Sequence, residues 1–327
     1  MIALEYWIET PLVNALGWTL FCFVWQAALI ASILAAILLL WRPASARARY
    51  GLACLAMAAM PAAFGLTLIR SVPPTRDAAT APLANAGPAL DSRQISSGWI
   101  GSFPPNLYSR LPWVVPFWMT GVACFYLYSV AGWMAARSLR RTGVLPAALE
   151  WRERLSALAD RLRLKTPILL LESSRVDVPV VIGVLRPAIL LPVALLTGLP
   201  AGQLELILIH ELAHIRRYDY LVNLLQKCVE ALLFYHPAVW WVSGLIRIER
   251  ENCCDDIVVE ASGEPREYAL TLATLEWNRS AARAALAANG GSLMKRIRRM
   301  LKEPETSRAA YAPVFSAGLL LLSIGLA

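Results

Sequence analysis

The chain has 327 residues and a formal net charge of +8, and 57% of its residues are hydrophobic. Soluble domains average about 45–50% apolar residues, so this composition and a mean hydropathy of +0.52 exclude an ordinary soluble protein and indicate membrane spans. Lysine and arginine collect in the cytoplasmic loops of membrane proteins, and the positive charge therefore gives no reason to expect direct binding of nucleic acid.

Four apolar runs without charged residues predict four transmembrane helices. A helix needs about 20 apolar residues to cross the hydrocarbon core of a bilayer. The first three runs reach this length, and the last one is short for a span. The runs are Leu12–Trp41, Tyr50–Ile69, Pro112–Ala136 and Tyr311–Ala327.

Basic clusters set the expected orientation of these helices. Arginines follow the first and the third run, and a third basic cluster precedes the fourth run. Positive loops stay in the cytoplasm, so we expect a multi-pass membrane protein with its amino terminus outside. The expected plan is two spans joined by a short cytoplasmic loop (1–69), an extracytoplasmic loop (70–111), a third span (112–139), a cytoplasmic domain (140–310) and a fourth span (311–327).

The predicted cytoplasmic domain mixes helices and strands. We expect a helix at about 147–163, a strand at Ile168–Leu171, a β-hairpin within Pro179–Pro192, a helix ending near Arg217 and another at about Tyr220–Phe234. An exposed strand edge of the hairpin could dock an extended substrate, although a plain core sheet is the alternative. The apolar segment Val239–Ile246 is expected to lie against the bilayer, with Trp240 and Trp241 at headgroup level.

One helical segment carries the pattern of a catalytic metal site. His210 and His214 are four residues apart, so both imidazoles leave the same face of a helix and can hold one Zn²⁺. Glu211 follows the first histidine and places a carboxylate beside the metal, where it can take a proton from a bound water. The alternative is a buried helix with two chance histidines.

A third ligand is expected because a catalytic zinc takes three protein ligands and keeps one position for water. The acidic segment Arg247–Asp256 supplies most candidates. Glu251 and Asp255 share a helix face, so one can bind the metal while the other accepts the free N–H of a ligand histidine. Spacing leaves the choice open among Glu249, Glu251, Asp255, Asp256 and His236.

Three motifs together resemble the BlaR/MecR family of membrane metallopeptidases, which are bacterial sensor-transducers for β-lactam antibiotics. The motifs are His210–Asp219, Phe234–Trp241 and Glu249–Asp256, and Pro179–Pro192 resembles the family as well. The resemblance implies a mainly α membrane protein with four transmembrane helices and an inserted cytoplasmic α+β zinc metalloprotease domain of the gluzincin type. It also implies zinc bound by His210, His214 and Glu251, Glu211 as general base and Asp255 behind a ligand histidine, with Asp219, His236 and Glu249 as further residues near the site.

The same resemblance implies an endopeptidase that cleaves a cytoplasmic protein, such as a winged-helix repressor, and also itself. We expect self-cleavage between about Ala281 and Met294, around the flexible segment Asn289–Ser292, and the alternative is that 289–292 is only a turn between helices. A homodimer is left open. Family sensors carry a penicillin-binding domain after the fourth span, whereas this sequence ends at Ala327. We therefore expect either a shortened chain or a member that senses its signal differently.

Two other functions remain open at this point. One is a non-catalytic signalling scaffold with a structural zinc, although such a site has no use for the carboxylate of Glu211. The other is a membrane quality-control or prenyl-protein-type protease, since these share the zinc helix.

Overall fold

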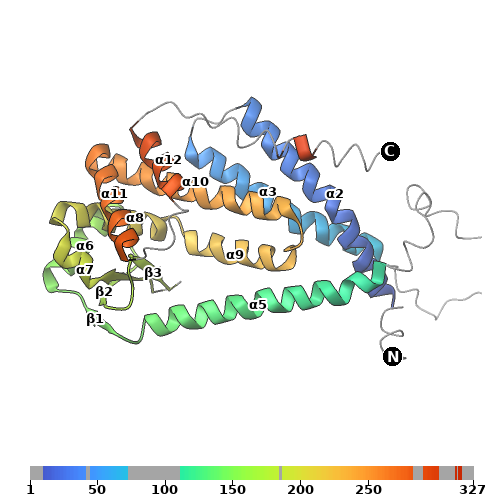
Figure 1. Ribbon diagram of the computed structural model, residues 1–327, viewed down its shortest axis with the longest axis horizontal. Coiled ribbons are helices and arrows are strands. Elements are labelled where there is room, and N and C mark those ends of the chain that lie inside the picture. Colours follow the sequence, from blue (N-terminus) through green and yellow to red (C-terminus); the bar gives the residue numbers. More distant parts are fainter. Residues whose placement is uncertain are drawn as a thin grey trace, which may run out of the picture.

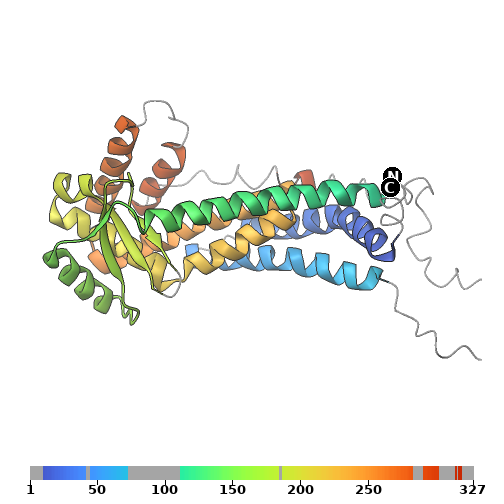
Figure 2. The same cartoon turned by 90° about the horizontal axis from the view of Figure 1, so that it is seen from below.

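The computed structural model describes residues 10–41, 45–72, 111–183, 186–282, 290–301, 314 and 316–318. The protein is mainly helical and elongated. Long helices run side by side over most of its length, and a small sheet with shorter helices forms one end (Figures 1 and 2).

Three described helices are long and apolar enough to cross a membrane. They are α2 (Pro11–Leu40), α3 (Ala46–Ser71) and the continuous pair η3 (Leu111–Trp113) and α5 (Val114–Leu139). They coincide with three of the four predicted spans. Only residues 314 and 316–318 of the fourth predicted span are described, and they are helical, whereas 73–110 of the predicted loop lie outside the described residues.

A helical hairpin of α9 (Asp219–Leu232) and α10 (Pro237–Ser262) lies alongside these spans (Figure 1). At its tip the Tyr235 hydroxyl donates to the Leu20 carbonyl at 3.0 Å, and Nε2 of His236 lies 3.1 Å from the Val24 carbonyl, about halfway along α2. Pro237 begins α10, and the His236 side chain accepts from the backbone N–H of Ala238.

The expectation that Val239–Ile246 lies against the bilayer is wrong for its apolar face. Val239, Val242, Leu245 and Ile246 are at most 5% exposed and pack with Phe23, Ala27, Met57 and Met60 of the spans. Because these side chains are buried against α2 and α3, they do not contact lipid. Van der Waals packing between the helices, and not the hydrophobic effect of water, holds the hairpin there.

The sheet at the other end contains four strands in the order β1-β2-β4-β3. β1 (Val144–Pro146) is antiparallel to β2 (Leu169–Ser173), β2 is parallel to β4 (Ala188–Pro192), and β3 (Val180–Ile182) is antiparallel to β4. The last pair confirms the predicted hairpin, while the short β1 and α7 (Val193–Gly198) were not predicted.

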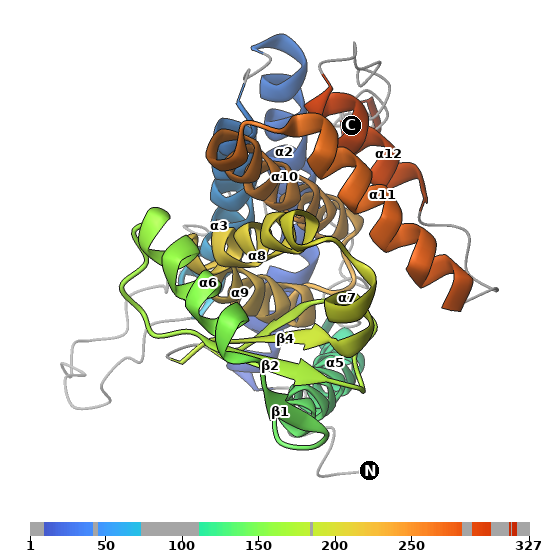
Figure 3. The same ribbon diagram turned by 90° about the vertical axis from the view of Figure 1, so that its left-hand side faces the viewer.

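Helices α6 (Leu149–Arg161) and α8 (Ala201–Arg216) cover this sheet (Figure 3). Leucines of α6 and α8 form one core with the fully buried strand β4, which includes Ile189 and Leu191. Nine residues of α8 are buried, so this helix is fixed on several sides and carries its histidines on a rigid support.

The last helices, α11 (Pro265–Ala282) and α12 (Gly290–Met300), pack beside α10. Arg299 of α12 forms an ion pair of 2.7 Å with Asp256 of α10. Gly290–Ser292 begin α12, which is anchored to α10, so these three residues are not the flexible segment that self-cleavage would need. Residues 283–289 lie outside the described residues, so self-cleavage at Ala281–Met294 stays a prediction.

Candidate metal centre

Two nitrogens of α8 converge at the centre of the candidate site. Nε2 of His210 and Nε2 of His214 are 3.2 Å apart, and the rings lie edge to face. Tetrahedral zinc with Zn–N bonds of about 2.0–2.1 Å places two ligand nitrogens about 3.3 Å apart. The separation therefore fits two imidazoles that share one metal ion.

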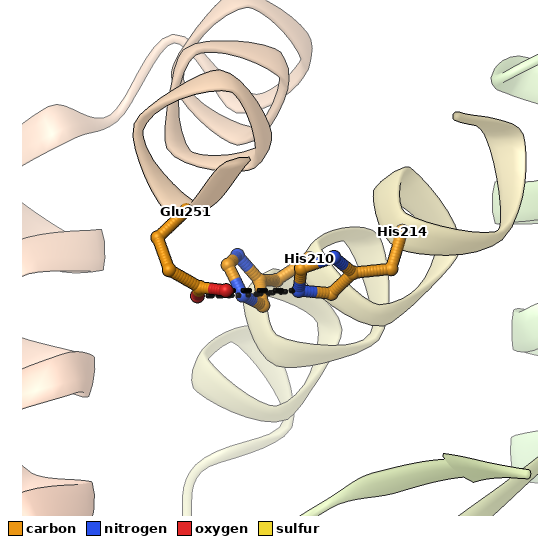
Figure 4. Close-up of side chains that lie close together, drawn as sticks. All are labelled: His210, His214 and Glu251. Atoms are coloured by element: carbon orange, nitrogen blue, oxygen red, sulfur yellow. Dashed lines mark hydrogen bonds and ion pairs between the residues drawn. The ribbon is translucent and has the colours of Figure 1, made fainter. Parts of the chain in front are cut away.

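Glu251 reaches this pair from the neighbouring helix α10 (Figure 4). Its carboxylate oxygens lie 3.5 Å from Nε2 of His210 and 3.8 Å from Nε2 of His214. The ligand atoms of the three residues all lie within 4.8 Å of one another. Two nitrogens and one carboxylate on two helices form a donor set that can hold a divalent metal and leave a position for water.

Three other candidate ligands point elsewhere. Glu249 is 3% exposed and pairs with Arg49 at 2.8 Å and with the amide of Asn252 at 3.1 Å. Asp256 pairs with Arg299, and His236 lies at the hairpin tip on α2. Neighbouring side chains, and not helix spacing alone, therefore separate Glu251 from these residues.

Tyr268 of α11 stands between Asp255 and His210. Its hydroxyl lies 2.9 Å from Nδ1 of His210 and donates to Oδ1 of Asp255 at 2.8 Å, whereas Asp255 is 3.7 Å from the same nitrogen. With a proton on Nδ1 of His210, the tyrosine oxygen accepts from the ring, and Nε2 keeps its lone pair for a metal. Asp255 thus supports the histidine through Tyr268 and not directly. Arg296 of α12 holds Asp255 at 2.7 Å.

Asp219 supports the other histidine directly. Its Oδ2 lies 2.8 Å from Nδ1 of His214. The carboxylate is 4% exposed and also accepts from Nε of Arg217 at 3.3 Å and from the Tyr50 hydroxyl of α3 at 3.4 Å. Nδ1 of each imidazole is therefore hydrogen-bonded. This fixes the tautomer in which the lone pair of Nε2 is free for a metal ion.

Cys254 forms a second group with His214 and Asp219 that could hold a metal. Its Sγ lies 3.3 Å from Nδ1 of His214 and 3.5 Å from Asp219. Burial and the negative charge of Asp219 raise the pKa of the thiol, and a metal needs the thiolate. The group also uses the histidine nitrogen that Asp219 already engages, so the His210–His214–Glu251 group is the better metal site.

Opposite charges lie close together in this site and shift one another's pKa values. Burial opposes ionisation of Glu251, but its hydrogen bond to His210 and the nearby charges of His210, His214 and Arg296 lower its pKa to about 2. Burial also works against protonation of His210, yet the hydrogen bond to Glu251 and the charges of Asp255 and Glu211 raise its pKa.

Glu211 is half-buried next to His210 on α8. Burial raises the pKa of its carboxyl group, against the lowering effect of His210 and His214. Within the described part of the chain it forms no hydrogen bond or ion pair, so its oxygens are available to a water or a substrate.

Sequence reasoning did not single out Tyr268 or Arg296. Tyr268 lies in the apolar core beside Ala269 and Leu272. A buried tyrosine usually needs a hydrogen-bond partner for its hydroxyl, and this need is the one signal that could have connected Tyr268 with the polar site. Arg296 belongs to the basic cluster before the fourth apolar run, which the expected orientation of that span already explained.

Comparison with known proteins supports the resemblance. The family model described as BlaR1 peptidase M56 matches residues 20–300. The chain is 25% identical to the Regulatory protein BlaR1 of Bacillus licheniformis over 143 residues, which are 44% of this chain and 24% of that protein. It is 22% identical to the Methicillin resistance mecR1 protein of Staphylococcus aureus over 148 residues, 45% of this chain and 25% of that protein. The similarity thus spans about a quarter of the length of these relatives.

Proposed function

Because the chain belongs to the BlaR1 peptidase M56 family, a family of metallopeptidases in membrane proteins, we propose that it is a zinc-dependent endopeptidase that transmits a signal by cleaving a cytoplasmic regulator. The observation that carries this proposal is the convergence of Nε2 of His210, Nε2 of His214 and the carboxylate of Glu251 within 4.8 Å. The printed names of the relatives, a regulatory protein and a methicillin resistance protein, support the signalling role.

Each residue of the site has a proposed task. His210, His214 and Glu251 would hold Zn²⁺, and the bound metal would make water a nucleophile at neutral pH and polarise a carbonyl group. Glu211 would accept the proton of the attacking water and deliver it to the leaving amine, and its raised pKa suits both directions of transfer. Tyr268, Asp255 and Asp219 would keep the imidazoles in the required tautomer and orientation.

The edge strand β3 is the proposed dock for the substrate. It pairs with β4 on one side, and α8 with the histidines lies beside it. An extended peptide could add to the unpaired side of β3 by main-chain hydrogen bonds, which favours an unfolded or flexible segment of a regulator. A winged-helix repressor is the partner that we propose, and self-cleavage near 281–294 would use the same dock.

The membrane orientation is part of the same proposal. The metal centre lies at the end of the bundle where α2 ends and α3 begins, and the arginines near that turn favour the cytoplasmic side of a bacterial inner membrane. A cytoplasmic substrate is then accessible to the site.

The test compares new protein amino termini in cells that express the wild type or Glu211→Gln at equal levels. We expect a few new amino termini that appear in the wild type and not in the Glu211 variant, and we expect one of them to lie in a regulator. Many Glu211-dependent termini in membrane proteins would favour a quality-control protease. No dependent termini, with zinc bound stoichiometrically by the purified wild type, would instead favour a non-catalytic scaffold.

A further inference from the structure

A cavity of about 470 Å³ that is open to solvent lies between the start of span α3 and the carboxyl-terminal ends of α6, α8 and α10. Its volume falls in the range of small-molecule sites, about 300–1,000 Å³. Three arginines from three different helices and one glutamate line it together with apolar groups. The lining residues are Arg47, Arg161, Leu162, Arg216, Ile257, Glu260 and Ala261.

The charge of this cavity selects for anions. Among the described residues, Arg47 and Arg216 form no ion pair, and Arg161 donates only to the backbone carbonyl of Ala261. Three guanidinium groups against the single carboxylate of Glu260 leave an excess of positive charge. Guanidinium groups present planar pairs of N–H donors that match the oxygens of phosphate, so a phosphate group is the chemistry that this lining recognises.

The position of the cavity indicates where such a phosphate comes from. Arg47 lies in the first turn of α3, directly after the turn that joins two membrane-spanning helices. On that turn Leu40 and Trp41 are 84% and 75% exposed, as expected of side chains that contact the interfacial region of a bilayer. A basic pocket at this depth lies at the level of lipid headgroups.

We propose that this cavity binds the phosphate group of an anionic phospholipid. The headgroup would connect α3, through Arg47, to α8, through Arg216, and to α6, through Arg161. Arg216 follows the metal-binding histidine His214 by two residues, so an occupied cavity would hold the end of the catalytic helix against the membrane surface. The binding itself does not depend on the proposed peptidase activity.

The experiment uses the full-length protein in lipid nanodiscs of phosphatidylcholine, with or without phosphatidylglycerol. Its readouts are thermal unfolding and the phospholipids that remain bound after delipidation, identified by mass spectrometry. The pocket variant is Arg47→Gln/Arg216→Gln. The matched control, Arg141→Gln/Arg152→Gln, removes the same charge from exposed positions outside the cavity. Phosphatidylglycerol should stabilise the wild type and the control, whereas the pocket variant should bind it about five- to thirtyfold more weakly.

A third variant tests the cavity without removing an arginine. Glu260 is exposed and lines the same cavity, so Glu260→Gln should strengthen binding of phosphatidylglycerol severalfold. Equal losses in the pocket and control variants, or no gain in Glu260→Gln, would mean only a diffuse attraction between a basic surface and the membrane and would overturn the proposal. Equal stabilisation by inorganic phosphate or soluble glycerol phosphate would assign the cavity to a soluble ligand and overturn the lipid source.

Discussion

Arg49, in the first turn of span α3, forms an ion pair of 2.8 Å with Glu249, which lies two residues before the candidate ligand Glu251. The side chain of Glu249 is 4% exposed and that of Arg49 is 19% exposed, so the pair is shielded from water. It joins a membrane span to the helix that carries the candidate third ligand.

The first prediction concerns this pair. Arg49→Met should destabilise the protein by about 3–5 kcal/mol, because it leaves the Glu249 carboxylate buried without its partner. The double variant Arg49→Met/Glu249→Met should recover most of the loss. Thermal unfolding in detergent measures both. The control is Glu150→Gln, which breaks the exposed pair with Arg154. It should lower the free energy of unfolding by less than about 0.5 kcal/mol.

The second prediction concerns Asp219. Asp219→Asn should weaken zinc binding about 10–100-fold, because His214 loses the carboxylate that fixes its tautomer. Competition with a chelator measures the affinity, and Asp160→Asn on the exposed face of α6 is the control. An unchanged zinc affinity in the Asp219 variant would show that the hydrogen bond to His214 does not orient the ligand.

The third prediction separates Tyr268 from Asp255. Tyr268→Phe removes the hydroxyl between Asp255 and His210. Nδ1 of His210 then loses its hydrogen-bond partner while Asp255 keeps Arg296, which should cost about 1–3 kcal/mol of stability. Zinc affinity should fall as well. If Asp255 instead contacts the histidine directly in the zinc-bound protein, Tyr268→Phe will retain the wild-type affinity while Asp255→Ala loses it.

The fourth prediction concerns pH. Zinc binds the neutral form of His210, and because the pKa of this residue is raised, protons should begin to compete with the metal above the usual histidine value of about 6.5. Affinity should then fall about tenfold per pH unit on acidification. Glu251, with a pKa of about 2, stays ionised over this range. A flat zinc affinity between about pH 5 and 8 would contradict the assignment.

The fifth prediction concerns orientation. After the exposed Cys124 and Cys228 are replaced by serine, a cysteine at Arg141 should be protected from membrane-impermeant thiol reagents in intact cells. A cysteine at Ser97, in the predicted outer loop, should react. Labelling of the first position and protection of the second would place the metal centre outside the cell.

The sequence was most informative where local geometry decides the outcome. His210 and His214 converge because the helix repeat sets their spacing, and this could be read without a structure. The three apolar runs became helices because lipid leaves the backbone few alternatives. By contrast, spacing favoured Glu251 over Glu249 but could not decide between them, since Arg49 of a distant span is what occupies Glu249.

Contacts between side chains that meet only through tertiary packing could not be predicted from the sequence either. Tyr268 comes from a helix that no motif connected with the site, and its hydroxyl takes the position expected for Asp255. His236 was a candidate ligand because any histidine can bind metal, yet its ring caps α10 and contacts α2. The sequence contains no local signal for either arrangement.

Helix α10 connects the middle of the membrane spans, where the hairpin tip contacts Val24, with the candidate metal centre. α10 is one uninterrupted helix of 26 residues, about 39 Å long at 1.5 Å per residue. One end is hydrogen-bonded inside the bundle of spans, and Glu251 projects from its other half toward two histidines on a separate helix. A shift of α10 relative to α8 would therefore move the carboxylate relative to the imidazoles, so the distance between these two helices sets whether the three groups can close around one ion.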